Sequence, residues 1–265
     1  MGLENFVIEK VGGFTRETPE VRWWGVVGFR LEEYKFDRKH PITVSGTPPS
    51  EGAAIIVGNH RDKYDTIKLF KAMRTLLPLG RIVRTYARHN LLDPKIKESA
   101  EVLEQIGERD DDLENEPYLK KWSRALVIRG IGAISLRRRG VNTEALKTGT
   151  RLLKSGEIVG GFISDTRSRD GTIRGVMNGM AFLARMNPNV PIYIVSTSGY
   201  PDGPETARIA DTSLTFAKDS TGSTKEDLCK FTILLADNIA DLSPIRVRNA
   251  WQNRRDQELE RLLTE

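Results

Sequence analysis

Several features that would decide the class of a protein are scarce or missing in this sequence of 265 residues. Cysteine occurs once, at Cys229, so no disulfide framework can form and a cytoplasmic location is expected. No uncharged apolar run approaches the roughly 18 residues that a transmembrane helix needs. Residues 1–16 lack the basic-then-apolar order of a signal peptide. Three scattered histidines and one cysteine give no ligand spacing for a metal site, so none is expected.

Aromatic residues are few as well, at 7%, and they are not interleaved with basic residues as nucleic-acid stacking platforms require. No nucleic-acid partner is therefore expected. The formal net charge of +5 still favours an anionic partner, such as a phosphorylated substrate, coenzyme A, an acidic carrier protein or anionic lipid. Two adjacent tryptophans, Trp23 and Trp24, fit either a membrane–water interface or packing on the core, and this choice stays open.

Short apolar runs alternate with amphipathic stretches through most of the chain. Runs of strand length and composition cover residues 42–45, 53–57, 81–86, 132–136, 158–163 and 190–195. Helical spacing covers 143–154, 179–186, 224–242 and 246–263. This alternation predicts an α/β protein with a mostly parallel central sheet flanked by helices. Because no linker divides the chain, we expect a single domain over 1–265, with a motif-bearing core at about 42–198 and extensions at 1–41 and 224–265.

A histidine and an aspartate follow the apolar run 53–57, where that strand should end. His60 comes after Gly58-Asn59, and Asp65 follows five residues later. Ligands of α/β sheets bind outside the carboxyl ends of the strands, so His60 is placed where chemistry commonly occurs. If His60 precedes the next helix and Asp65 lies in its first turn, Asp65 can orient the imidazole of a general base. Alternatively, Asp65 serves only to cap the helix start and stabilise its dipole.

A second polar segment follows the apolar run 158–163. It combines hydroxyl and guanidinium side chains, from Thr166, Arg167, Ser168 and Arg169. Arginine binds phosphate bidentately, so this segment suits an anion site. Arg137–Arg139 follow another predicted strand, and they either converge on the same sheet edge or form a solvated or nucleic-acid-binding loop. Taken with His60 and Asp65, the anion site indicates acyl transfer from a thioester to a hydroxyl on a phosphate-bearing acceptor.

Four blocks in order resemble the glycerolipid acyltransferase family, typified by 1-acylglycerol-3-phosphate acyltransferase. The family's Asn-His-x4-Asp block is matched by Asn59-His60 and Asp65. Its second block, Gly-x-x-aromatic/aliphatic-Ile-x-Arg, is similar to residues 132–138, and its third, Phe-Pro-Glu-Gly-Thr-Arg-Ser, to 162–168. The fourth block, Val-Pro-Ile, is matched at 190–192. The resemblance covers roughly residues 42–198, and four ordered blocks are far more specific than one.

The resemblance implies a role for each matched residue. His60 is expected to be the general base and Asp65 its orienting partner, while Arg138 and Arg167 bind the acceptor's phosphate. Main-chain N–H groups near His60 are expected to stabilise the oxyanion. The other substrate-binding positions that the resemblance implies are Asn59, Ser164, Asp165, Thr166 and Ser168. The donor would be acyl-coenzyme A or an acyl carrier protein thioester, and no cofactor is expected.

Two departures from the family pattern affect the acceptor more than the chemistry. Ile163-Ser164-Asp165 replaces Pro-Glu-Gly, so the glutamate that helps to bind the acceptor is missing. Since no transmembrane span is expected, the resemblance implies a peripheral enzyme on an anionic membrane surface. The main hypothesis is acyl transfer to a lysophosphatidic-acid-like acceptor in phospholipid synthesis. The alternatives are the same chemistry on glycerol 3-phosphate, a sugar or an aminolipid, or a non-catalytic lipid-binding protein on this fold.

Overall fold

The computed structural model divides the chain into two compact units. One comprises Met1–Tyr34 and Tyr86–Ala145, and the other Lys35–Thr85 and Leu146–Glu265. The single-domain organisation stays a prediction. The structure describes residues 34, 38, 41–47, 49, 51–61, 65–66, 68–69, 72, 83–88, 125, 128, 132–136, 142–164, 167–168, 172–199, 204–216 and 224–264. Trp23 and Trp24, with most of the expected N-terminal extension, lie outside these residues.

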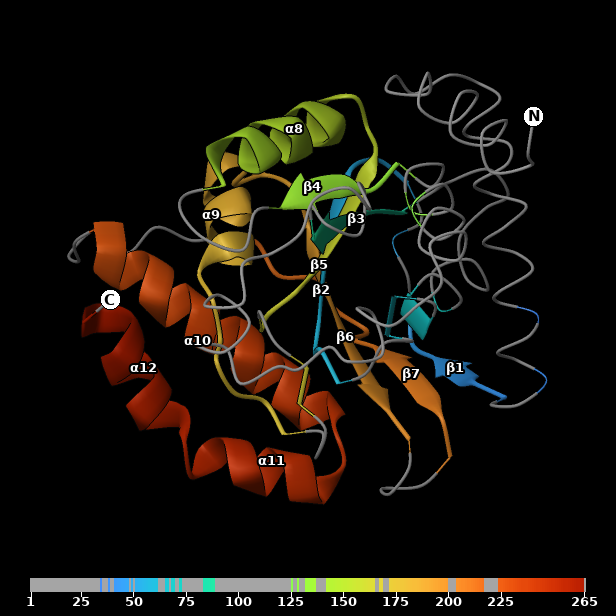
Figure 1. Cartoon of the computed structure of the whole chain (residues 1–265), viewed down its shortest axis with the longest axis vertical. Coiled ribbons are helices and arrows are strands. Elements are labelled where there is room, and N and C mark those ends of the chain that lie inside the picture. The colour runs from blue at the N-terminus through green and yellow to red at the C-terminus, as the bar shows by residue number, and fades with distance from the viewer. Residues whose placement is uncertain are drawn as a thin grey trace, which may run out of the picture. The chain divides into compact units, whose positions relative to one another are not determined.

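Seven strands within the described residues form one sheet (Figure 1). The strands are β1 Thr43–Ser45, β2 Ala54–Gly58, β3 Val83–Arg88, β4 Ile134–Leu136, β5 Ile158–Phe162, β6 Ile192–Ser198 and β7 Thr206–Ile209. Their order is β1-β7-β6-β2-β5-β3-β4. Every neighbouring pair is parallel except β6 and β7, which are antiparallel. The predicted mostly parallel α/β sheet is confirmed, with strand ends that differ from the predicted ones by only a few residues.

Strand β2 lies at the centre of the larger unit. All five of its residues are buried, as expected for a parallel strand covered on both faces. Parallel partners flank it: β5 pairs with β2 on one side and β6 on the other. Hydrophobic residues from five strands, from the segment after β2 and from the position before β1 form the core here: Ile42, Ala54, Ile56, Leu69, Ala72, Val83, Ile158, Val195, Ala207 and Ile209. The loop that leaves β2 is therefore anchored to the most buried strand of the sheet.

A glycine on β5 leaves room for a side chain of the neighbouring strand β3. A Cβ atom at Gly160 would lie 2.9 Å from Val83 Cγ1, closer than real Cβ contacts allow, whereas Leu69 Cδ2 of the segment after β2 would lie 3.4 Å away. The described residues of the segment, at 65, 66, 68, 69 and 72, are helical. Leu69 is 1% exposed in the core, so its burial anchors this segment, and with it Asp65 and Lys68, to the sheet.

Five of the helices in the described part of the chain have defined bounds. They are α8 Thr143–Lys154, α9 Gly179–Met186, α10 Thr224–Leu242, α11 Ile245–Gln252 and α12 Arg255–Thr264. The bounds of α8, α9 and α10 are the predicted ones. Helix α10 packs on β6 and contacts α9, which is gold in Figure 1, and the red helices α11 and α12. Two residues after α8, Gly156 has a φ of 83°, the left-handed conformation that commonly follows the end of a helix.

The predicted continuous helix over 246–263 is wrong. The chain turns at Asn253 and Arg254, so α11 and α12 are separate helices. Asp237 of α10 explains the turn, because it accepts hydrogen bonds from Trp251 Nε1 at 2.8 Å and Arg255 Nε at 3.0 Å. Trp251 is 1% exposed, and burying its side chain stabilises the fold more than the hydrogen bonds of a continuous helix would.

Strand β7 was not predicted from the sequence. It has four residues, and only Ala207 and Ile209 face the core. Its pairing with β6 on one side and β1 on the other stabilises it. Because this stabilisation comes from neighbouring strands, the residues of β7 themselves carry no clear strand pattern. Among the described helices, none combines the length and apolar character needed to cross a membrane.

Candidate active site

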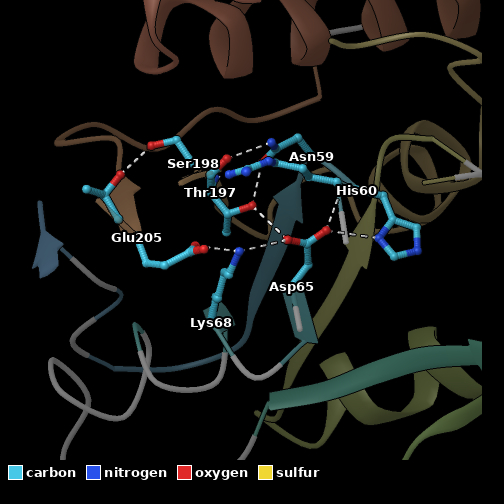
Figure 2. A network of polar contacts seen from close by, with 9 residues as sticks. Asn59, His60, Asp65, Lys68, Thr197, Ser198 and Glu205 are labelled. Carbon is cyan, nitrogen blue, oxygen red and sulfur yellow. Dashed lines mark hydrogen bonds and ion pairs between the residues drawn. The ribbon is translucent and has the colours of Figure 1, made fainter. Parts of the chain in front are cut away.

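The candidate site lies where β2, β5 and β6 end. Asn59 follows β2 directly and is 5% exposed. Its side-chain Nδ2 donates to the carbonyl oxygen of Thr197 at 2.9 Å, and its Oδ1 accepts from Thr197 N at 2.7 Å. These bonds tie the loop after β2 to the end of β6, as Figure 2 shows. They support a positioning role for Asn59, and its expected contact with substrate stays a prediction.

His60 and Asp65 face each other across the start of the helical segment (Figure 2). His60 Nδ1 lies 3.2 Å from Asp65 Oδ2. The Asp65 side chain is fully buried, whereas that of His60 is 19% exposed. Asp65 is helical and His60 is not, which is the arrangement that the residue spacing required. The two residues therefore form a dyad with a buried carboxylate and an imidazole that reaches solvent.

The buried carboxylate of Asp65 has partners on both oxygens. Oδ2 accepts from the main-chain N–H of Arg61 as well as facing His60. Oδ1 lies 3.1 Å from Thr197 Oγ1 and 3.8 Å from Lys68 Nζ. The Thr197 hydroxyl is also 3.1 Å from Asn59 Oδ1, so its single proton is shared between two acceptors. Such saturation holds the carboxylate plane fixed, as an orienting group requires.

This geometry selects one tautomer of His60. A carboxylate can only accept, so a neutral imidazole that faces Asp65 with Nδ1 carries its proton there. The lone pair is then on Nε2, the ring nitrogen that can take a proton from a hydroxyl. The dyad can act as a general base without any residue of the chain serving as nucleophile.

An aromatic ring supports the imidazole. The rings of His60 and Phe162 stack with centroids 4.4 Å apart and an angle of 10° between their planes. Phe162 ends β5 beside Gly58 of β2, one residue before the loop that carries His60. The stack restricts rotation of His60 about its side-chain bonds and provides an apolar face on one side of the base.

The loop after β5 is bonded to the loop after β2. The main-chain N–H of Ser168 donates to the carbonyl oxygen of His60 at 3.0 Å. Ser168 is 3% exposed, and its hydroxyl lies 3.3 Å from that of Thr172. Ser164 is 8% exposed and forms an isolated bridge with Val176. The two predicted segments, which are distant in sequence, therefore meet at one sheet edge.

Of the other predicted site residues, the structure describes Arg167 but not the rest. Arg167 is half-buried in the loop that Ser168 joins to His60. Asp165, Thr166 and Arg138 lie outside the described residues, as do Arg137, Arg139 and Arg169. No group of three or more histidine, cysteine, aspartate or glutamate side chains in the described ranges could hold a metal ion.

Four residues around the dyad were missed by reasoning from the sequence. Phe162 was noted as part of a motif but not as a partner of His60, and Thr197 lay beyond the predicted end of its strand. Lys68 is fully buried, with Nζ 2.7 Å from Glu205 Oε2. A lysine in an otherwise apolar helical stripe, next to Leu69, was the one local signal, and nothing local pointed to Glu205.

Three comparisons with known proteins bear on the identity of the chain, and the family model is the one that shows it. A protein-family model described as Acyltransferase matches residues 41–198, more than half of the chain. A comparison with curated proteins finds no match. Among solved structures, the chain is similar to the crystal structure of the 1-acyl-sn-glycerophosphate (LPA) acyltransferase, PlsC, from Thermotoga maritima. That similarity has 17% identity over 90% of this chain and 88% of the other, with a TM-score of 0.46. On the extent of the family match, the chain belongs to the acyltransferase family.

Proposed function

We propose that this acyltransferase moves a fatty acyl group from an acyl-coenzyme A or acyl carrier protein thioester to the hydroxyl of a lysophosphatidic-acid-like acceptor. His60 is the general base and Asp65 its orienting partner. The observation that carries the proposal is the dyad itself: an imidazole 3.2 Å from a fully buried carboxylate, at the carboxyl end of a central parallel strand. Phospholipid synthesis at an anionic membrane surface is the proposed setting.

The reaction needs two proton transfers at His60. As the acceptor oxygen attacks the thioester carbonyl carbon, its proton passes to Nε2 of His60, and the carbonyl oxygen becomes an oxyanion. The tetrahedral intermediate then collapses, the carbon–sulfur bond breaks, and the thiolate takes the proton from the imidazolium. Ester and free thiol are the products, and the dyad returns to its starting state. Asp65 stabilises the imidazolium between the two steps.

A different acceptor is the second candidate, and one observation favours it. Ser164 stands where the family's third block has a glutamate, and it is 8% exposed. A buried serine provides no charge for the groups that such a glutamate would bind. Glycerol 3-phosphate, a sugar or an aminolipid would then replace the lysophospholipid, with His60 and Asp65 unchanged in role.

The proposal is tested by thiol release from palmitoyl-coenzyme A with and without lysophosphatidic acid. We expect release that requires the acceptor, together with formation of phosphatidic acid. Release only with another hydroxyl compound in a panel would assign the changed acceptor to the Ser164 segment. If no thiol is released with any acceptor, or with acyl carrier protein donors, the proposed enzymatic activity is contradicted and a lipid-binding protein on this fold is favoured.

Replacing Arg167 by alanine should raise the KM for the acceptor about ten- to a hundredfold, because a charge-assisted bond to phosphate is worth roughly 1.5–3 kcal/mol. The KM for the donor should change little. Steady-state kinetics with each substrate varied in turn give both values. Arg174→Ala removes an exposed arginine from the same loop and is the matched control. An equal rise in both KM values would show that Arg167 does not bind the acceptor's phosphate.

Replacing Phe162 by leucine should lower kcat about two- to tenfold with both KM values nearly unchanged. Leucine keeps the apolar contact but loses the aromatic stack, worth about 0.5–1.5 kcal/mol, that restrains the His60 ring. Phe182→Leu, at a residue that is 41% exposed on α9, is the control for the same substitution elsewhere. A kcat equal to that of the parent would mean that the stack does not restrain the base.

A further inference from the structure

A buried lysine lies on the far side of the catalytic carboxylate from His60. The side chain of Lys68 is 0% exposed, which is unusual for a group whose charge needs a partner when it leaves water. Its Nζ lies 2.7 Å from Glu205 Oε2 and 3.8 Å from Asp65 Oδ1. Figure 2 shows His60, Asp65, Lys68 and Glu205 in one line of contacts. The proposed mechanism uses the first two of these and leaves the others unassigned.

Lys68 and His60 hold different oxygens of the same carboxylate. His60 faces Asp65 Oδ2, and Lys68 faces Oδ1, where Thr197 also donates. A positive charge on one oxygen withdraws negative charge from the other. The strength with which Asp65 stabilises a protonated His60 therefore depends on how much of the lysine charge reaches Asp65.

Glu205 limits that charge. Its carboxylate is closer to Lys68 than Asp65 is, and its side chain is 16% exposed. The 2.7 Å contact is an ion pair without the directed geometry of a hydrogen bond. The main-chain carbonyl of Glu205 accepts from Thr43 N at 3.0 Å, which fixes the residue between β1 and β7. The ammonium is therefore shared between two carboxylates, one of them in the dyad.

A glycine makes room for this arrangement. Gly199, one residue past β6, is buried, and a Cβ atom there would overlap the carboxylate of Glu205. Since φ at Gly199 is not positive, the backbone itself does not require glycine. The space beside the main chain is needed for the carboxylate that binds Lys68.

We propose that Lys68 and Glu205 are a pair of positioning residues that set the basicity of His60 through Asp65. The inference rests on the proposed function of the dyad. With His60 neutral, the ionised groups Asp65, Lys68 and Glu205 carry a net charge of −1, since two carboxylates share one ammonium. Proton transfer to His60 brings the buried group to neutrality. Removing either member of the pair changes the charge that faces Asp65, and this change is what the variants below measure at His60.

The charged residues around the dyad come from three segments of the described chain. Lys68 lies on the same helical segment as Asp65, and Glu205 precedes β7. Arg61 lies in the connecting loop, is 8% exposed and donates its main-chain N–H to Asp65. Arg61 is unchanged in every variant considered, so its effect is constant. The changes expected below come from the lysine and the glutamate alone.

The first test follows the histidine ring signals of the full-length protein by NMR as pH is varied. The chain has three histidines, and the signal lost in His60→Gln identifies His60. Lys68→Met should raise the titration midpoint of His60 by roughly one pH unit, because two carboxylates are left without the ammonium. Glu205→Gln should lower it by a similar amount, because the ammonium then acts on Asp65 alone. The acidic limb of kcat/KM with palmitoyl-coenzyme A and lysophosphatidic acid should move in the same directions.

Two further variants separate electrostatics from folding. Gly199→Ala displaces the Glu205 carboxylate without removing any charged group, and it should lower the midpoint as Glu205→Gln does. The double variant Lys68→Met/Glu205→Gln removes one charge of each sign, so its midpoint should lie between those of the single variants. Lys230→Met and Glu226→Gln break an exposed ion pair of the same 2.7 Å length on α10 and are the matched controls, with no shift expected.

Opposite shifts from the two members of the pair would support the inference, because loss of structure alone gives no such reversal of sign. If Lys68→Met and Glu205→Gln shift the His60 midpoint in the same direction, or if neither shifts it, the inference is overturned. If Lys68→Met does not fold, Gly199→Ala and Glu205→Gln still test whether loss of the Glu205 carboxylate lowers the His60 midpoint, and no decrease would overturn the inference. A parent protein without acyltransferase activity would refute the proposed function, yet the NMR midpoints would still test the coupling of the pair to His60.

Discussion

Replacing His60 by alanine is expected to lower kcat/KM by about a thousandfold, within the range of roughly 10²–10⁴ that a general base contributes. The reason is that no other group in the dyad can accept the acceptor's proton. Asp65 is fully buried behind the imidazole, so it cannot take over the base's role from its present position. Thiol release with palmitoyl-coenzyme A and lysophosphatidic acid measures the loss.

The substitution should leave the fold intact. His60 is partly exposed and lies in a loop, and its replacement removes one ring stack with Phe162 rather than a core side chain. Circular dichroism and the thermal midpoint check this directly. His40→Gln and His89→Gln, at the other two histidines of the chain, control for the loss of an imidazole as such. Turnover by His60→Ala near that of the parent would eliminate the mechanism.

Much of the sheet could be predicted because parallel strands buried on both faces read as short apolar runs. The run at 53–57 became β2, and the helices α8, α9 and α10 begin and end where their patterns do. Strand β7 and the turn between α11 and α12 escaped prediction because tertiary partners decide them. Asp237, which bonds Trp251 and Arg255, is distant from both in sequence. No local propensity contains that information.

The dyad could be predicted because its two members are close in sequence and follow one strand. The residues around it could not, because they come from separate strands. Since β2 lies between β5 and β6, Phe162 and Thr197 arrive on opposite sides of the loop after β2. Glu205 directly precedes β7, and the antiparallel pairing of β7 with β6 brings it beside Lys68. Strand β7 was not predicted from the sequence. Predicting these partners requires strand order, which the sequence does not state locally.

Strand order also gives the site its rigidity. Asn59 bonds the end of β6, and Ser168 bonds the main chain of His60 from the loop after β5. The Ser168 contact joins main-chain atoms alone, and the Asn59 side-chain amide bonds the main chain of Thr197, so both contacts depend on the register of β2 with its neighbours. A base held in this way has little freedom to lose when substrate binds, which lowers the cost of reaching the reactive geometry.

Replacing Asp65 by asparagine is expected to lower kcat by about a thousandfold or more, as the loss of an orienting carboxylate does in serine–histidine–aspartate triads. The two side chains have nearly the same shape, so the effect is one of hydrogen-bond direction. At the position of Oδ2 the carboxylate accepts from Arg61 N and faces His60 Nδ1. An amide that keeps its oxygen there must turn its NH2 group toward Lys68, which can only donate, and leaves the Thr197 hydroxyl to donate to Asn59 alone.

The opposite orientation of the amide is no better for catalysis. Its NH2 group would then face His60 and draw the lone pair of the imidazole to Nδ1, leaving the proton on Nε2, where the acceptor hydroxyl must deliver its own. Either orientation opposes a donor with a donor or places the wrong tautomer at the reaction. Nitrogen chemical shifts of the His60 ring distinguish these states, and steady-state kinetics give kcat.

A matched control exists on α10. Asp237 also accepts several hydrogen bonds, from Trp251 and Arg255, and Asp237→Asn should cost stability while kcat stays within about twofold of the parent. A kcat for Asp65→Asn within a few-fold of the parent would show that Asp65 serves only to stabilise the helix start, the alternative that its spacing from His60 left open. A thousandfold loss with the fold retained, and a changed tautomer at His60, would instead assign the carboxylate to the chemistry, because a helix-capping role predicts a change in stability and none in the tautomer.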